Sequence, residues 1–248
     1  TIAGGNPEGQ GGFNDVGLSG IALTALEWST DPEPKRQVRE LLRNTPSIDV
    51  VQFTLGMNDF HEFLPGQVTE PVINQLYEQT AFHIEEVIKW VLDIRPDVRV
   101  VVMGYDYPNI VEGFITGEDG VIIGENTNDT VRFWDIFGWD PQNFFDALAF
   151  QAFYNSLYVG IEQRKIAVAQ AYDRVEYINN LGYLQALFGV PYFSVEPNAP
   201  DGLPATKEQG FAPFPAGYPE LFTPIDLMND PVHQAPEGYV ALMHNAIN

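Results

Sequence analysis

The chain has 248 residues, of which 34 are acidic and 12 basic, so its formal net charge is −22. Such a charge repels phosphate backbones and anionic lipid headgroups, so we expect binding neither to nucleic acid nor to a membrane. Hydrophobic residues make up 45% and charged residues 19%, a composition that excludes disordered and fibrous chains. The absence of cysteine excludes disulfides, thiolate metal sites and cysteine nucleophiles.

The composition also bears on location and domain organisation. An acidic chain without cysteine is typical of secreted, periplasmic or salt-adapted proteins, although many cytosolic proteins also lack cysteine. We expect a secreted or periplasmic protein. No apolar run approaches the 18 residues that a membrane span requires. Because no internal repeat or clear linker divides the chain, we expect residues 1–248 to form a single domain.

The first half of the chain predicts alternating helices and strands. Short helices are expected over 21–28 and 35–43, and an apolar run over 48–55 predicts a buried strand. A long amphipathic helix begins near Pro71 and ends at Pro96, and a second buried strand follows over 100–103. Strands this uniformly apolar, separated by a helix, predict a parallel sheet covered on both faces, hence an α/β fold with three α/β/α layers.

The second half is less regular. Residues 109–140 predict an insertion of loops or a hairpin, and its acidic stretch 118–129 is either a solvated loop or a calcium loop that matches no EF-hand spacing. A long helix then runs from Asp140 towards Tyr172, and a final amphipathic helix over 236–247. Ten aromatic residues lie between 133 and 158. We therefore expect an aromatic-rich insertion or lid at about 109–160, which forms a groove wall or a surface for oligomerisation.

Asn58 follows the strand over 48–55, in the motif Gly56-Met57-Asn58-Asp59. Ligands of doubly wound sheets bind beyond the carboxyl ends of the strands, so the amide of Asn58 is placed to enter a cleft there. Such an amide can donate a hydrogen bond to a developing oxyanion. An ordinary turn at the end of a strand is the alternative.

Asp230 and His233 stand three residues apart, just before the last helix. This spacing lets the carboxylate accept a hydrogen bond from Nδ1–H of the imidazole, which leaves Nε2 available as a general base. Gly20, at the end of Gly17-Leu18-Ser19-Gly20, lies where a loop enters a helix and can present its backbone N–H to an anion. The segment 104–108 ends the second strand at the same edge of the sheet. We expect it to be structural, with Tyr105 and Tyr107 lining the cleft.

Together these motifs resemble the SGNH (GDSL-type) hydrolase superfamily. In that family a Gly-Asp-Ser motif supplies the nucleophile, a later glycine and the asparagine of Gly-x-Asn-Asp complete the oxyanion hole, and Asp-x-x-His supplies acid and base. Gly20, Asn58, Asp230 and His233 match these motifs in the right order. The resemblance implies a flavodoxin-like α/β/α sandwich and a Ser-His-Asp triad.

The Gly-Asp-Ser motif is absent from the chain. Its five serines are Ser19, Ser29, Ser47, Ser156 and Ser194, and none follows an apolar strand in a turn of that kind. The resemblance implies that the missing motif ends the first, central strand of the sheet. We therefore expect that strand and its serine on a segment outside this sequence, either a cleaved N-terminal peptide that stays bound or a part of the chain that the sequence does not include.

The sequence thus predicts a serine esterase, lipase, carbohydrate acyl-ester hydrolase or acyltransferase acting on a small-molecule or carbohydrate ester. The alternative is a non-catalytic secreted binding or structural subunit on the same scaffold, because the nucleophile is missing. No spacing typical of a zinc site or of a nucleotide loop occurs, so we expect neither a metal nor a cofactor. His83 is expected to be a packing residue at the edge of its helix.

Overall fold

The computed structural model describes residues 23–60, 66–111, 114–116, 122–125, 143–190, 195–197, 223–224, 227–228 and 234–247. Their elements, in chain order, are the helices, strands and one 3₁₀ turn that follow. These are α1 (Ala25–Thr30), α2 (Pro32–Asn44), β1 (Val50–Phe53), η1 (Met57–Phe60), α3 (Glu70–Ile94), β2 (Arg99–Met103), β3 (Phe114–Thr116), β4 (Ile122–Glu125), α5 (Phe144–Gln170), β5 (Val175–Ile178), α6 (Tyr183–Phe188) and α7 (Pro236–Ile247).

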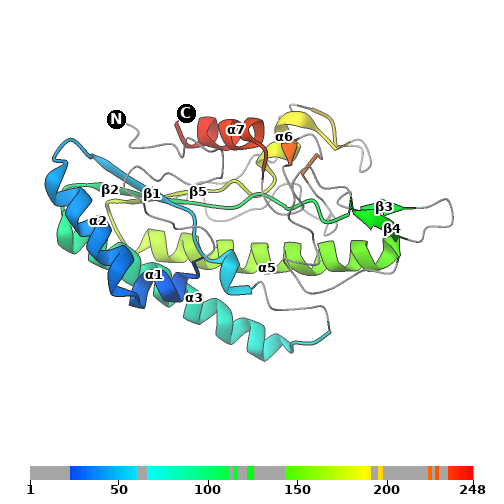
Figure 1. Cartoon of the computed structure of the whole chain (residues 1–248), viewed down its shortest axis with the longest axis horizontal. Helices are drawn as coiled ribbons and strands as arrows, with labels where there is room; N and C mark the ends of the chain where they lie inside the picture. The colour runs from blue at the N-terminus through cyan, green and yellow to red at the C-terminus, as the bar shows by residue number, and fades with distance from the viewer. Residues whose placement is uncertain are drawn as a thin grey trace.

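The main sheet has three parallel strands in the order β1-β2-β5. In its register Val51 is opposite Val100, which in turn is opposite Val175. Helices α1, α3 and α5 lie on one side of the sheet, and α6 and α7 lie on the other (Figure 1). The predicted parallel strands and α/β class are confirmed. The strand β5 is an addition that the sequence analysis did not predict.

Side chains of Val98 and of β2 alternate between the two faces of the sheet and contribute to a hydrophobic core on each face. Val98, Val100 and Val102 are fully buried and pack with α3 and α5 in the larger cluster. Val101 and Met103 point to the other face and pack in a smaller cluster with α6 and α7. Each fully buried aliphatic side chain contributes about 1.5–3 kcal/mol. Burial on both faces explains why β2 is apolar at almost every position.

Helices α3 and α5 approach each other closely at Gly160. A Cβ built on this residue would lie 2.1 Å from Cζ of Tyr77, so the ring of Tyr77 occupies the space that any larger residue would need. The hydroxyl of Tyr77 donates to the backbone carbonyl of Ser156, at 3.1 Å. The glycine therefore fixes the distance between the two longest helices below the sheet.

Capping residues explain where the helices begin. Thr24 caps α1: its hydroxyl accepts the backbone N–H of Glu27 at 3.1 Å, and the carboxylate of Glu27 accepts the N–H of Thr24 at 2.8 Å. Asp31 caps α2, and Pro71 lies in the first turn of α3. Among the described helices, none is long and apolar enough to cross a membrane.

The expected insertion at about 109–160 divides into two parts. Strands β3 and β4 form an antiparallel hairpin, one of the two forms predicted for 109–140. Residues 144–160 instead belong to α5, which packs in the core: Phe150, Tyr154 and Tyr158 are buried, whereas Phe145 is 78% exposed. Residues 126–142, which carry four of the ten aromatic residues and the end of the acidic stretch, lie outside the described residues.

Strand β1 forms one edge of the described sheet. It pairs with β2 on one side, and no described strand pairs with its other side. Val50 at its start is 50% exposed, and Val51 and Phe53 are partly buried. The additional strand expected from the sequence, beside the strand over 48–55, would pair with this side.

Candidate active site

A tight turn follows β1 and places Asn58. Gly56 has φ +119°, a conformation that L side chains rarely adopt, and a Cβ there would also lie 3.1 Å from Cγ1 of Ile161. The chain then enters η1, in which Met57 and Phe60 are buried and Asn58 is partly buried. Gly56 thus turns the chain at the carboxyl end of β1, and this turn requires glycine.

Asn58 and Asp59 both contact the segment that enters α1. The side-chain amide of Asn58 donates to the backbone carbonyl of Leu23, at 3.3 Å. The carboxylate of Asp59 accepts the backbone N–H of Ala25 at 2.8 Å. Burial raises the pKa of Asp59, and the backbone N–H groups of Ala25 and Leu26 act against the rise. The described chain begins three residues after Gly20, which itself lies outside the described residues.

Tyr105, which follows β2, lies beside the Asn58 turn. Its ring meets that of Tyr158 edge to face, with centroids 5.6 Å apart. Burial and the charge of Glu162 raise the pKa of the Tyr105 phenol, and the backbone N–H of Met57 acts against the rise.

The predicted acid and base, Asp230 and His233, lie outside the described residues. The residues on either side are described: Met228 and Gln234 form an antiparallel bridge, and the N–H of Ala235 donates to the carbonyl of Leu227 at 2.7 Å. This pairing brings the two ends of the segment together at the start of α7. Of the four predicted site residues, only Asn58 has a described position.

The described residues contain one Ser–His contact, between α1 and α3. Oγ of Ser29 lies 2.8 Å from Nδ1 of His83 and donates to the backbone carbonyl of Leu26 at 2.9 Å. Ser29 has one hydroxyl proton for these two partners, so the tautomer of His83 decides whether Nδ1 donates to Ser29 or accepts from it. His83 joins the two helices, which agrees with its predicted packing role.

A buried ion pair lies on α5, below the ends of β2 and β5. Glu162 and Lys165 are both fully buried, and their charged groups are 2.7 Å apart. The carboxylate also accepts the backbone N–H of Tyr105 at 3.2 Å and the hydroxyl of Tyr177 at 2.8 Å. Burial lowers the pKa of Lys165, and the charge of Glu162 acts against that change. This pair was not predicted from the sequence, although two charged residues on an apolar helix face indicated it.

Asp106, next to Tyr105, is a buried carboxyl that caps α6. It accepts the backbone N–H groups of Tyr107, Gly182 and Leu184, at 2.7, 2.7 and 2.8 Å. Burial raises the pKa of Asp106 to about 7, although the three N–H groups act in the opposite direction. This carboxyl ties the end of β2 to the loop that follows β5.

Replacing Asp106 with asparagine is expected to destabilise the protein and to change its pH dependence. The amide nitrogen cannot accept a backbone N–H, whereas the hydroxyl oxygen of a protonated carboxyl still can, so we expect a loss of about 1–3 kcal/mol. Asp106 keeps its proton up to about pH 7 in the folded state, against 3.8 as the ordinary value. Its contribution to stability is therefore largest at low pH and falls as the pH rises from 4 to 7. The stability gap between wild type and Asp106→Asn should shrink accordingly.

Urea unfolding at about pH 5 and about pH 7.5 measures the stability gap near the lower end of this pH range and above its upper end. Both pH values lie above the isoelectric point near 4.2. Asp49→Asn is the matched control, because Asp49 is an exposed carboxyl just before β1. A gap that stays constant, or that grows with pH, contradicts the assignment.

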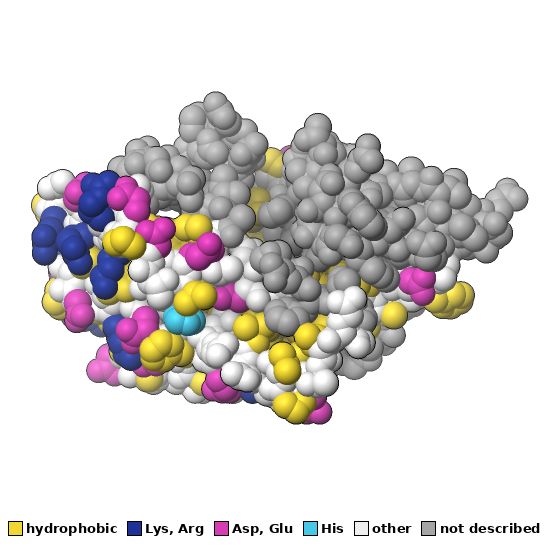
Figure 2. All heavy atoms as spheres, turned by 60° about the horizontal axis from the view of Figure 1, so that its bottom comes forward, with side chains coloured by type: hydrophobic (Ala, Val, Ile, Leu, Met, Phe, Trp, Pro, Cys, Tyr) yellow, Lys and Arg dark blue, Asp and Glu magenta, His cyan; other side chains and the backbone are white. Residues whose placement is uncertain are grey.

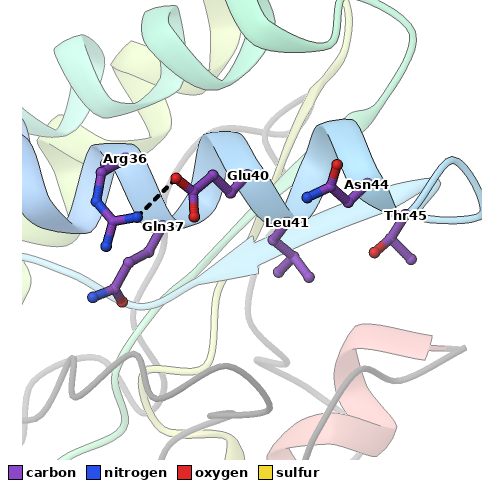
Figure 3. Close-up of a pocket in the computed structure, with 6 residues that line it drawn as sticks. All are labelled: Arg36, Gln37, Glu40, Leu41, Asn44 and Thr45. Atoms are coloured by element: carbon purple, nitrogen blue, oxygen red, sulfur yellow. Dashed lines mark hydrogen bonds and ion pairs between the residues drawn. The ribbon is translucent and has the colours of Figure 1, made fainter.

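A hollow in the described surface lies away from these residues, on α2. It is lined by Arg36, Gln37, Glu40, Leu41, Asn44 and Thr45 (Figure 3). Arg36 is paired with Glu40 at 2.7 Å across one side of it. Lys and Arg side chains gather among acidic ones at one end of the face that carries α1, α2 and α3 (Figure 2). The lining comes from one helix face and its end, and no predicted site residue contributes to it.

No family model matches the chain, and no curated protein matches it. The resemblance to SGNH hydrolases therefore rests on the motifs in the sequence. A grouping of three or more histidine, aspartate or glutamate side chains that could hold a metal ion does not occur among the described residues.

Proposed function

We propose that this chain is the acid–base and oxyanion-binding part of an SGNH-type serine ester hydrolase or acyltransferase. The observation that carries the proposal is the position of Asn58. Its amide lies at the carboxyl end of a parallel strand and contacts Leu23, three residues after Gly20. The proposal assigns Gly20 and Asn58 to one oxyanion hole, and the contact of Asn58 with the segment that follows Gly20 supports that assignment.

In the proposed reaction His233 takes the proton of a serine hydroxyl as the serine attacks the ester carbonyl carbon. Asp230 orients His233 and stabilises the imidazolium. The amide of Asn58 and the backbone N–H of Gly20 donate to the oxyanion. The C–O bond to the alcohol then breaks, and His233 returns the proton to the departing oxygen. Water, or a sugar hydroxyl in a transferase, cleaves the acyl-enzyme in the same way.

Among the described residues no strand pairs with the outer edge of β1, and this supports a place for the nucleophile. Native proteins usually cover or protect the edge strands of their sheets. We place the serine at the end of an additional strand that pairs with this edge, parallel to β1. A parallel neighbour of β1 ends beside Gly56, so a serine just beyond its last residue lies next to Asn58.

Labelling with a fluorophosphonate tests the proposal, because this reagent reacts with serines that a base activates. The complete protein, as isolated, is treated with the reagent and its peptides are mapped. We expect label on a serine outside residues 1–248, and we expect His233→Ala to abolish labelling, since the serine then lacks its base.

Two results would contradict the proposal. Label on one of the five serines of this chain would mean a different active site. No labelling of a well-folded protein would favour the non-catalytic binding or structural subunit.

A further inference from the structure

The short turn η1 carries two side chains that hold the same neighbouring segment. The amide of Asn58 donates to the backbone carbonyl of Leu23 at 3.3 Å, and the carboxylate of Asp59 accepts the backbone N–H of Ala25 at 2.8 Å. Both contacts join η1 to the entry of α1, 35 and 34 residues earlier in the chain. Consecutive residues of one turn thus bind two positions of a single distant segment.

The segment that Asp59 contacts is itself well fixed. Thr24 caps α1 through a reciprocal pair of hydrogen bonds with Glu27, and Ala25, the first residue of the helix, is fully buried. The first N–H groups of a helix have no acceptor within the helix, and a buried one that stays unpaired is costly. Asp59 supplies the acceptor for the N–H of Ala25, so this contact sets the distance between η1 and the start of α1.

The hydrophobic core holds η1 from another side. Phe60 is fully buried, its ring centre lies 5.3 Å from that of Tyr77 on α3, and its carbonyl accepts the hydroxyl of Tyr154 on α5 at 3.3 Å. Phe60 therefore fixes η1 against α3 and α5, and Asp59 fixes it against α1. With both sides held, the backbone of Asn58 has little freedom to move.

The geometry points to Asp59 as a positioning residue for Asn58, which acts by holding η1 against the start of α1. This inference rests on the proposed function, in which Asn58 and Gly20 donate to one oxyanion. Oxyanion donors lower the barrier because they are oriented before the reaction begins, and small displacements of them cost rate. In this role Asp59 keeps Asn58 beside the segment that follows Gly20 and does not touch the reacting atoms.

Asp59→Ala tests the inference, because it removes the acceptor of the Ala25 N–H. In the complete protein we expect this amide hydrogen to exchange about tenfold faster, measured by NMR, since its hydrogen bond is lost. We expect kcat for a short acyl ester to fall about tenfold with KM within about twofold, because Asn58 acts mainly in the transition state. Asp59→Asn keeps an oxygen that can accept the N–H, so its kcat should stay within about threefold of wild type.

Asp31→Ala is the matched control. The carboxylate of Asp31 accepts the backbone N–H of Glu33 at 2.9 Å, so this variant also removes an acceptor at the start of a helix, α2. It should change neither kcat nor the exchange of the Ala25 amide. Thermal unfolding shows whether each variant is folded, and Asp59→Leu, which also lacks the acceptor, replaces Asp59→Ala if that protein does not fold. Loss of folding in both assigns Asp59 a general role in stability and overturns the inference.

The double variant separates this inference from the function on which it rests. If Asp59 acts through Asn58, then Asn58→Ala with Asp59→Ala has the same kcat as Asn58→Ala alone. Additive losses, an unchanged exchange rate of the Ala25 amide in Asp59→Ala, or equal losses of kcat in Asp59→Asn and Asp59→Ala overturn the inference and leave the proposed function intact. An Asn58→Ala protein with wild-type kcat instead overturns the proposed function.

Discussion

His233→Ala is expected to lower kcat for a short acyl ester by roughly 10⁴-fold or more in the complete protein, because the serine then keeps its proton. Asn58→Ala is expected to lower kcat by roughly 10²–10³-fold with little change in KM, since the amide binds the oxyanion more strongly than the ground-state carbonyl. Asp230→Asn should fall between wild type and His233→Ala, because the base remains but its tautomer and orientation are less well fixed.

The control for this series is His244→Ala, which removes an exposed imidazole from the last turn of α7. Its kcat should equal that of wild type. All the variants are expected to fold, and thermal unfolding checks this before kinetics are compared. If a folded His233→Ala protein keeps near-wild-type turnover, the assignment of Asp230 and His233 is wrong, and the non-catalytic alternative or another site replaces it.

Elements with strong local signals could be predicted from the sequence. Helix α3 begins with Pro71 in its first turn and ends before Pro96, and α2 begins at Pro32 after its cap Asp31, so proline and capping residues mark these helices. The strand β2 is apolar on both faces, which is typical of a covered parallel sheet. In these segments the local preference and the tertiary position agree.

Other elements depend on contacts that a local pattern does not contain. Strand β5 has four residues, with Glu176 in the middle, and it becomes a strand because it pairs with β2. Helix α1 begins at Ala25 rather than at the predicted residue 21. The reason is the Thr24–Glu27 capping box, a signal that the sequence carried and the apolar spacing obscured.

The candidate site shows the same division. Its position beyond β1 followed from a short motif and a general rule on parallel sheets, and the structure places Asn58 there. The contacts of Asn58 with Leu23, and of Tyr105 with Glu162, join segments that are 35 and 57 residues apart in the chain. Only a folded chain shows which polar groups meet across such separations, and for that reason the buried pair of Glu162 and Lys165 was not predicted.

Lys165→Met is expected to cost about 3–5 kcal/mol of unfolding free energy, because it leaves the charge of Glu162 buried without its ionic partner. Total stabilities of about 5–15 kcal/mol are usual, so the variant loses a large share of the stability of the fold. For a chain of this size the loss corresponds to a fall of about 10 °C in Tm. Chemical denaturation followed by circular dichroism measures it.

Two further variants show whether the loss comes from the uncompensated charge. Glu162→Gln combined with Lys165→Met removes both charges and keeps an acceptor for Tyr105, so it should recover most of the lost stability. Lys89→Met is the surface control: Lys89 pairs with Glu85 and Glu86 on α3 but is 44% exposed, so its loss should cost well under about 1 kcal/mol. If Lys165→Met is no less stable than Lys89→Met, the buried pair does not hold the ends of β2 and β5.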